Sequence, residues 1–102
     1  MRIGHARHNR RLAARNVDEL AERMVLGDGV ALDALKRRFA GQLHSISRTV
    51  LDDESEASDL VDGVFEDASR KWPPERGQVR VWLLRRMRRA TRRYLALRGD
   101  DE

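Results

Sequence analysis

The sequence predicts an all-α domain, built as a compact bundle of about four helices. Its 102 residues are the usual length of one domain and allow one modest core. Apolar residues recur every three or four positions in four segments, which is the spacing of amphipathic helices. Glycines, prolines and clustered acidic residues separate these segments, and such residues are typical of turns and helix ends.

The first helix is expected to begin at Asn16 and to end before the Gly27–Gly29 turn. Asn16 and Glu19 are three positions apart, which is the spacing of a capping box. A second, longer helix is expected from about Ala31 to Leu51. Gly41 weakens this helix by about 1 kcal/mol relative to alanine, so either a close helix crossing or a bend is expected there. The apolar stripe of the second helix contains Leu32, Leu35, Phe39, Leu43, Ile46 and Val50.

The third helix is expected from Glu56 to about Lys71, with Ser55 as its N-cap. At about 100° per residue, its apolar and acidic residues separate onto opposite faces. The apolar face contains Leu60, Val61, Val64, Phe65 and Ala68. The acidic face contains Asp59, Asp62 and Glu66. An acidic stripe of this kind is either a solvated surface or a binding surface for a partner.

The fourth helix follows a loop in which Pro73 to Gly77 exclude helical structure. Residues 80–98 carry eight arginines. The expected core seam of this helix contains Leu83, Met87, Ala90, Tyr94 and Leu97, flanked by Leu84, Thr91 and Leu95. Its other face contains Arg85, Arg86, Arg88, Arg89, Arg92 and Arg93, with Trp82 projecting from the middle. Trp82 is either a stacking platform for an unpaired base or a ring covered by the loop or the N-terminal arm.

Composition narrows the classes of function. The formal charge of +4 and the preference for arginine favour a polyanionic partner, although a GC-rich genome explains the arginines equally well. There is no cysteine, no apolar run long enough to span a membrane and no secretory signal, so we expect a cytoplasmic protein. We expect residues 1–15 to form a basic arm, residues 16–98 the helical domain and residues 99–102 an acidic tail.

Catalysis is not expected, because the sequence contains no nucleophile–base pair near a glycine turn and no phosphate-binding glycine loop. No cofactor is expected either. His5 and His8 have a metal-like spacing but no third ligand nearby, so we expect no metal site. The chain is therefore expected to act by binding.

The order of these features resembles region 2 of the bacterial RNA polymerase sigma factors of the sigma-70 family, especially the extracytoplasmic-function (ECF) group. Residues 27–51, GDGVALDALKRRFAGQLHSISRTVL, are similar to the opening helix pair of the family. Residues 56–69, EASDLVDGVFEDAS, are similar to its polymerase-binding helix. Residues 72–90, WPPERGQVRVWLLRRMRRA, resemble its loop and Trp-Leu-Leu-Arg helix. The resemblance covers about residues 17–98 and implies a sigma region 2-like bundle.

The resemblance also implies partners. Asp59, Asp62 and Glu66 would bind the coiled-coil of the β′ subunit of core RNA polymerase. Promoter DNA, including the single-stranded non-template strand of the minus-ten element, would be the second partner, and an anti-sigma factor a third. The loop from Pro73 to Gln78 would help to hold a base turned out of the stack. The implied DNA-binding residues are Trp82, Arg85, Arg86, Arg89, Arg93, Arg76 and Gln78.

The sequence departs from the family pattern at several positions. Asp62 and Gly63 stand where relatives commonly have Gln-Glu, and Arg89 and Arg93 stand where relatives have Asn and later Asp. Plain phosphate attraction is therefore an alternative to base-specific reading. A second helical domain normally follows in the family, so both an excised domain and a natural region-2-only protein are compatible with this chain. The two rival functions are a non-specific nucleic-acid-binding module and a protein that occupies the sigma site on polymerase without reading DNA.

Overall fold

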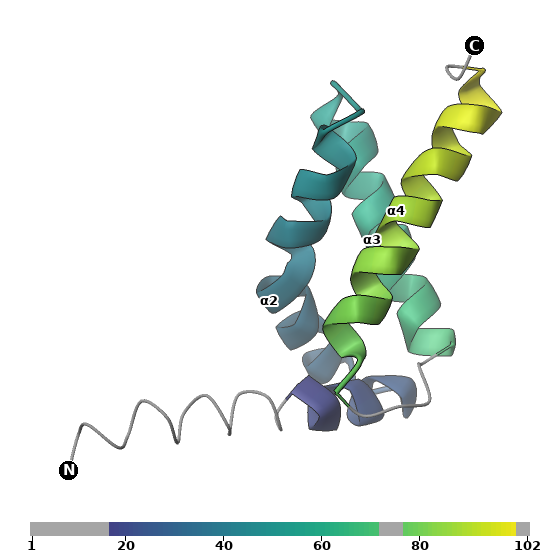
Figure 1. Cartoon of the computed structure of the whole chain (residues 1–102). Helices are drawn as coiled ribbons and strands as arrows, with labels where there is room; N and C mark the ends of the chain where they lie inside the picture. The colour runs from purple at the N-terminus through teal and green to yellow at the C-terminus, as the bar shows by residue number, and fades with distance from the viewer. Residues whose placement is uncertain (1–16, 72–76, 100–102) are drawn as a thin grey trace.

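The computed structural model describes residues 17–71 and 77–99, and these residues form an all-α bundle of four helices, as predicted. Residues 17–25 form the first helix. It is followed by α2 (Gly29–Arg48), α3 (Glu54–Arg70) and α4 (Val79–Arg98). Each of α2, α3 and α4 packs against the other two, and the first helix lies across the end of the bundle where α2 and α4 begin (Figure 1).

The turn between the first helix and α2 is held by Asp28. Gly27 adopts a φ of +96°, a conformation that favours glycine at the end of a helix. The Asp28 carboxylate then accepts hydrogen bonds from the backbone N–H groups of Val30 (3.0 Å) and Ala31 (3.2 Å) and pairs with Arg23. The Ala31 hydrogen bond, with help from Arg23, lowers the pKa of Asp28 from its ordinary value of 3.8. Because Asp28 is the cap, α2 begins at Gly29, earlier than expected.

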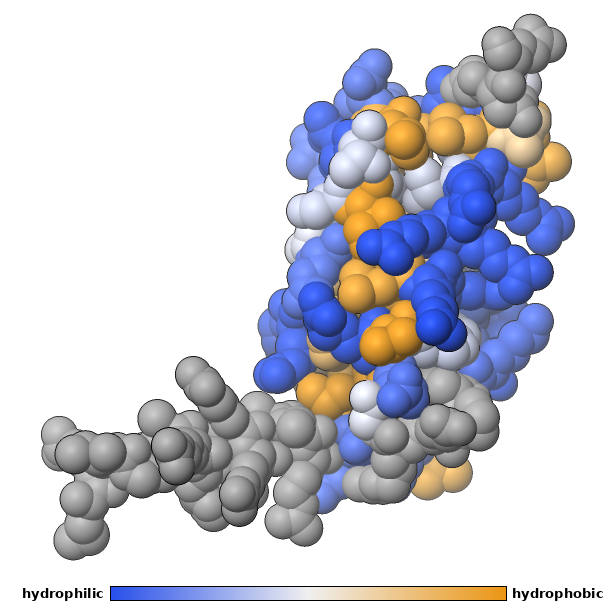
Figure 2. Space-filling view, in the orientation of Figure 1, coloured by the Kyte–Doolittle hydropathy of each residue, from blue (hydrophilic) through white to orange (hydrophobic). Residues whose placement is uncertain are grey.

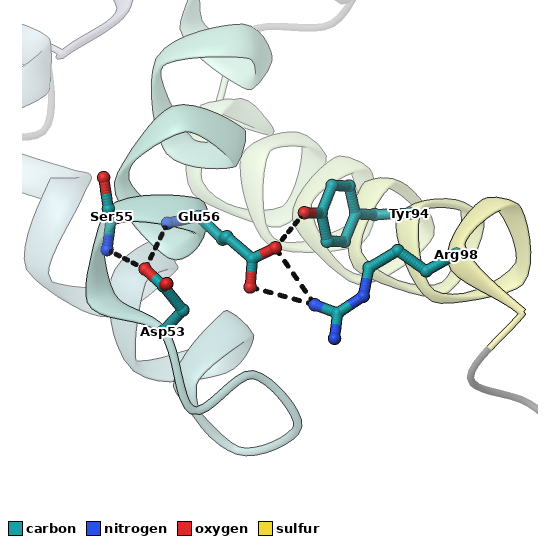
Figure 3. A network of polar contacts seen from close by, with 5 residues as sticks. All are labelled: Asp53, Ser55, Glu56, Tyr94 and Arg98. Atoms are coloured by element: carbon teal, nitrogen blue, oxygen red, sulfur yellow. Dashed lines mark hydrogen bonds and ion pairs between the residues drawn. The ribbon is translucent and has the colours of Figure 1, made fainter.

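The start of α3 is capped by Asp53, so the prediction of Ser55 as the cap was wrong. The Asp53 carboxylate accepts hydrogen bonds from the N–H groups of Ser55 (2.8 Å) and Glu56 (3.1 Å) (Figure 3). An aspartate at this position satisfies N–H groups that the helix leaves free and adds a negative charge at the positive end of the helix dipole. The preceding helix, α2, ends at Arg48, and Leu51 is buried in the connection.

The core confirms the predicted apolar face of α3. Val61, Val64, Phe65 and Ala68 are buried, and Leu60 packs against them from the edge. They meet the stripe of α2, in which Leu35, Phe39 and Leu43 are buried. The first helix contributes Ala21 and Met24 to the same cluster.

The predicted seam of α4 was wrong in its last turns. The buried residues of α4 are Val79, Leu83, Met87 and Thr91, which follow one another at intervals of four. Leu97 is 79 % exposed, whereas Thr91 is buried and donates its hydroxyl hydrogen to the carbonyl of Met87 (2.8 Å). The helix therefore packs along a ridge of residues that are four positions apart, which is a common mode of helix packing, and not along the face that a helical wheel predicts.

Replacement of Gly41 by alanine is expected to stabilise the domain. Gly41 is exposed in the middle of α2, and a Cβ atom at this position would meet no atom within 4 Å beyond the adjoining backbone of its own helix, so a close helix crossing does not require the glycine. The free energy of unfolding should rise by up to about 1 kcal/mol, measured by urea denaturation. Gly77→Ala is the contrasting variant, because the φ of +82° at Gly77 strains an alanine. Destabilisation by Gly41→Ala would contradict the expectation.

Candidate functional site

An acidic surface runs along α3 and consists of Asp59, Asp62 and Glu66. All three residues are exposed. Within the described part of the chain, their carboxylates form no hydrogen bond or ion pair. Gly63 lies beside them, also exposed, and a side chain added there would meet nothing within 4 Å. The acidic surface is therefore open to a basic partner, and the structure leaves room for a larger residue at Gly63.

An arginine surface runs along α4. Its members are exposed, line one shallow hollow, and have no carboxylate partner among the described residues. They are Arg85, Arg88, Arg89 and Arg92. Figure 2 shows hydrophilic side chains gathered over α4, beside an apolar strip between α2 and α4. Four guanidinium groups without neutralising carboxylates repel one another, so an anion such as phosphate that binds among them relieves that repulsion.

Arg86 differs from these arginines because it turns toward α3. Its guanidinium donates two hydrogen bonds to Oδ2 of Asp67, with Nη2 at 2.7 Å and Nε at 3.1 Å. Both side chains are roughly one-third exposed. Arg86, expected among the DNA-binding residues, is thus an ion-pair link between α3 and α4.

Trp82 is half-buried and packs against the core cluster, rather than projecting freely from the arginine face as expected. Its backbone N–H donates to the carbonyl of Gln78 (2.9 Å), and Gln78 itself is exposed just before α4. Arg76 and most of the loop from Pro73 lie outside the described residues. The indole is therefore neither sealed in the core nor fully available as a platform.

Trp82→Ala is expected to lower both stability and binding of single-stranded DNA. Removal of the half-buried indole should cost about 2 kcal/mol of folding free energy, roughly half of the cost at a fully buried site. Binding per folded molecule should fall about tenfold, because the exposed part of the ring is expected to stack on a base. Urea denaturation and fluorescence anisotropy measure the two effects separately, and Trp82→Phe, which keeps an aromatic ring, is the control. Unchanged DNA affinity per folded molecule would assign Trp82 to the core alone.

The start of α4 is tied to other helices by two polar contacts that the sequence did not reveal. Oδ1 of Asp18, in the first helix, accepts a hydrogen bond from the N–H of Gly77 (2.9 Å). Nε of Arg80 donates to Oε1 of Gln42 in α2 (3.1 Å). The partners are 59 and 38 positions apart, so no local pattern could have predicted them. Together they fix where Gln78 and Trp82 stand relative to the bundle.

The far end of α4 is tied to the start of α3 by Glu56, Tyr94 and Arg98 (Figure 3). The Tyr94 hydroxyl donates to Oε2 of Glu56, and Nη1 of Arg98 donates to both Glu56 oxygens at 2.9 and 3.1 Å. The Arg98 guanidinium also lies 5.5 Å from the centre of the Tyr94 ring. The hydrogen bond to Glu56 raises the pKa of Tyr94 above its ordinary value of 10.0.

Among the described residues, no helix combines the length and the apolar character needed to cross a membrane. Neither the curated proteins nor the solved structures compared with this chain gave a match. The family model for Sigma-70 region 2 matches residues 35–99, which is more than half of the chain. The matched segment contains the acidic surface of α3 and the arginine surface of α4. The chain therefore belongs to the sigma-70 region 2 family, whose members are non-enzymatic transcription initiation factors that in general bind RNA polymerase and recognise promoters.

Proposed function

We propose that this chain is a region 2 domain of the ECF type, which binds the β′ coiled-coil of core RNA polymerase through α3 and the opened minus-ten element through α4. One observation carries the proposal. The acidic surface and the arginine surface stand on different helices of one bundle, and neither is neutralised by the other within the described residues. A domain with two such surfaces can hold two partners of opposite charge at once.

The polymerase step depends on Asp59, Asp62 and Glu66. Exposed carboxylates on adjacent turns of a helix form a rigid row of negative charge, and such a row favours a basic helical partner. Glycine at position 63 adds no side chain to this contact. Complementary charge therefore sets the orientation and the encounter rate of the complex, and like charges at the same contact would oppose binding.

The DNA step depends on α4. Arg85 and Arg89 attract phosphates, and Arg93 extends the positive charge toward the end of the helix. An unstacked base at the start of α4 is assigned to Gln78, Arg76 and the exposed part of Trp82. Extrusion of a base costs a few kcal/mol, so groups held in advance around it lower that cost. The contacts of Asp18 and Arg80 support this assignment, because they fix the start of α4. Arg86 acts indirectly, through its link to Asp67.

The test uses the purified chain, bacterial core RNA polymerase and labelled single-stranded oligonucleotides with a short randomised segment. Binding to polymerase, together with enrichment of one sequence from the random pool, is the expected result. Failure to bind either partner would refute the proposal. Equal affinity for enriched and scrambled strands, with a salt slope of about 0.7 per phosphate contact, would show a non-specific nucleic-acid-binding module. Competition with a full sigma factor without any DNA affinity would show a protein that only occupies the sigma site.

A further inference from the structure

A second hollow lies between α3 and α4, next to the arginine surface, and has a volume of about 490 Å³. Its apolar lining comes from Leu60 of α3 and from Ala90 and Leu97 of α4. Leu97 is 79 % exposed, so this leucine is not used by the core. The hollow falls in the size range of pockets that hold small organic groups.

Tyr94 also lines this hollow, and its ring is held in place from two sides. Its hydroxyl is hydrogen-bonded to Glu56, and the Arg98 guanidinium lies over the ring. The hydrogen bond joins α4 to α3 and the Arg98 contact lies within α4, so the ring is already ordered before a ligand binds. A ring that is ordered in advance loses less conformational entropy on binding.

The charges around the hollow favour an anionic ligand. Among the described residues that line it, Asp67 is the only acidic one, and Asp67 is already paired with Arg86. Three further cations line the hollow, and no carboxylate among the described residues pairs with them. These cations are Lys71, Arg89 and Arg93.

The hollow adjoins the arginine surface, because Arg89 lines both. A chain of phosphates lying along α4 therefore passes the mouth of an apolar hollow with a tyrosine in its wall. Proteins that bind single strands combine these elements, a cationic track for the backbone and an aromatic ring for a base. An acidic peptide would satisfy the charges but would make no use of the aromatic ring or of the fork geometry with which guanidinium groups bind phosphates.

We propose that the hollow between α3 and α4 receives one unstacked base of a single-stranded nucleic acid, with the base against Tyr94 and the adjoining phosphates on Arg89 and Arg93. This subsite is distinct from the one assigned above to the start of α4. It rests on the proposed function only in taking a nucleic-acid strand as the ligand of α4.

The experiment compares Tyr94→Leu with Tyr94→Phe in the full chain. Tyr94→Leu removes the ring, whereas Tyr94→Phe keeps the ring and loses the hydrogen bond to Glu56. The probe is a labelled single strand in which each base in turn is replaced by an abasic site. For the unchanged chain, an abasic site at the position of the base in the hollow should lower the affinity about tenfold, separately from the position of the base assigned to the start of α4. Tyr94→Leu should lose about tenfold with the intact strand and become insensitive to that abasic position, and Tyr94→Phe should retain both affinity and sensitivity.

A second variant, Ala90→Leu, fills the hollow without removing a described contact, and should reproduce the Tyr94→Leu result if Tyr94→Leu fails to fold. The inference would be overturned if the unchanged chain, Tyr94→Leu and Ala90→Leu bound the single strand with equal affinity. A second result would also overturn the inference. If poly-glutamate binds the unchanged chain as tightly as the strand does, and Tyr94→Leu weakens that binding, the hollow is a peptide site. The proposed function fails separately. Loss of polymerase binding or of sequence preference in the unchanged chain would refute it and leave the comparison of the Tyr94 and Ala90 variants unaffected, whereas only a chain that binds no strand at all fails both tests.

Discussion

Reversal of two charges on the acidic surface, by Asp59→Lys together with Asp62→Lys, is expected to weaken binding to core RNA polymerase about 100-fold, which corresponds to about 2.7 kcal/mol. The change removes two attractive charges and places two cations opposite a basic partner, where juxtaposed like charges cost several kcal/mol. Both side chains are exposed and form no hydrogen bond or ion pair with another described residue, so the fold should be unaffected. Biolayer interferometry with immobilised polymerase measures the affinity.

The matched control is Glu19→Lys with Asp33→Lys. Both residues are exposed, on the first helix and on α2, and the pair produces the same change in net charge. Its polymerase affinity should stay within about threefold, because exposed charges farther apart than the Debye length of about 10 Å are largely screened. DNA binding should not fall in either double variant. If the two double variants bound polymerase with equal affinity, the acidic surface would not be the polymerase-binding site.

Neutralisation of the arginine surface is expected to produce the second large effect. The quadruple variant is Arg85→Gln, Arg88→Gln, Arg89→Gln and Arg92→Gln. If each arginine meets one phosphate, the slope of log affinity against log salt should fall by about 3, at roughly 0.7 per contact with a single strand. Affinity at low salt should fall at least 100-fold. Anisotropy titrations at several salt concentrations measure both quantities, and polymerase binding should be retained.

A control with the same change in charge separates local contacts from net charge. It neutralises four exposed arginines of α2 and α3, namely Arg37, Arg38, Arg48 and Arg70. This control should lower the affinity for DNA by much less, and its salt slope should stay close to that of the unchanged chain. If the two quadruple variants behave alike, α4 binds nucleic acid only through the overall charge of the protein.

Local patterns in the sequence were sufficient to predict how each helix is built. The spacing of Val61, Val64, Phe65 and Ala68 predicted the buried face of α3, because a helix rotates by a nearly constant angle per residue. The acidic run before α3 indicated a helix start, although the choice of Ser55 over Asp53 as the cap was wrong. The two residues have similar capping preferences, so the sequence could not decide between them.

Contacts between helices could not be predicted in the same way. A helical wheel placed Arg86 and Trp82 with the other arginines, but α3 brings Asp67 to Arg86 and the core covers part of Trp82. The wheel likewise assigned Leu97 to the core, whereas no other helix covers it enough to bury it. Periodicity shows which residues share a face of one helix, but not which residues lie opposite that face.

By itself, the sequence determined the helical class, the apolar faces that hold the bundle together and the separation of acidic from basic residues onto different helices, because these follow from local periodicity and composition. Only the tertiary structure decided which charges remain available for partners. The docking of α3 against α4 pairs Arg86 and Arg98 with Asp67 and Glu56 and leaves Arg85, Arg88, Arg89 and Arg92 without carboxylate partners among the described residues. Ion pairing depends on distances of a few ångströms between groups far apart in the chain, and packing alone sets those distances.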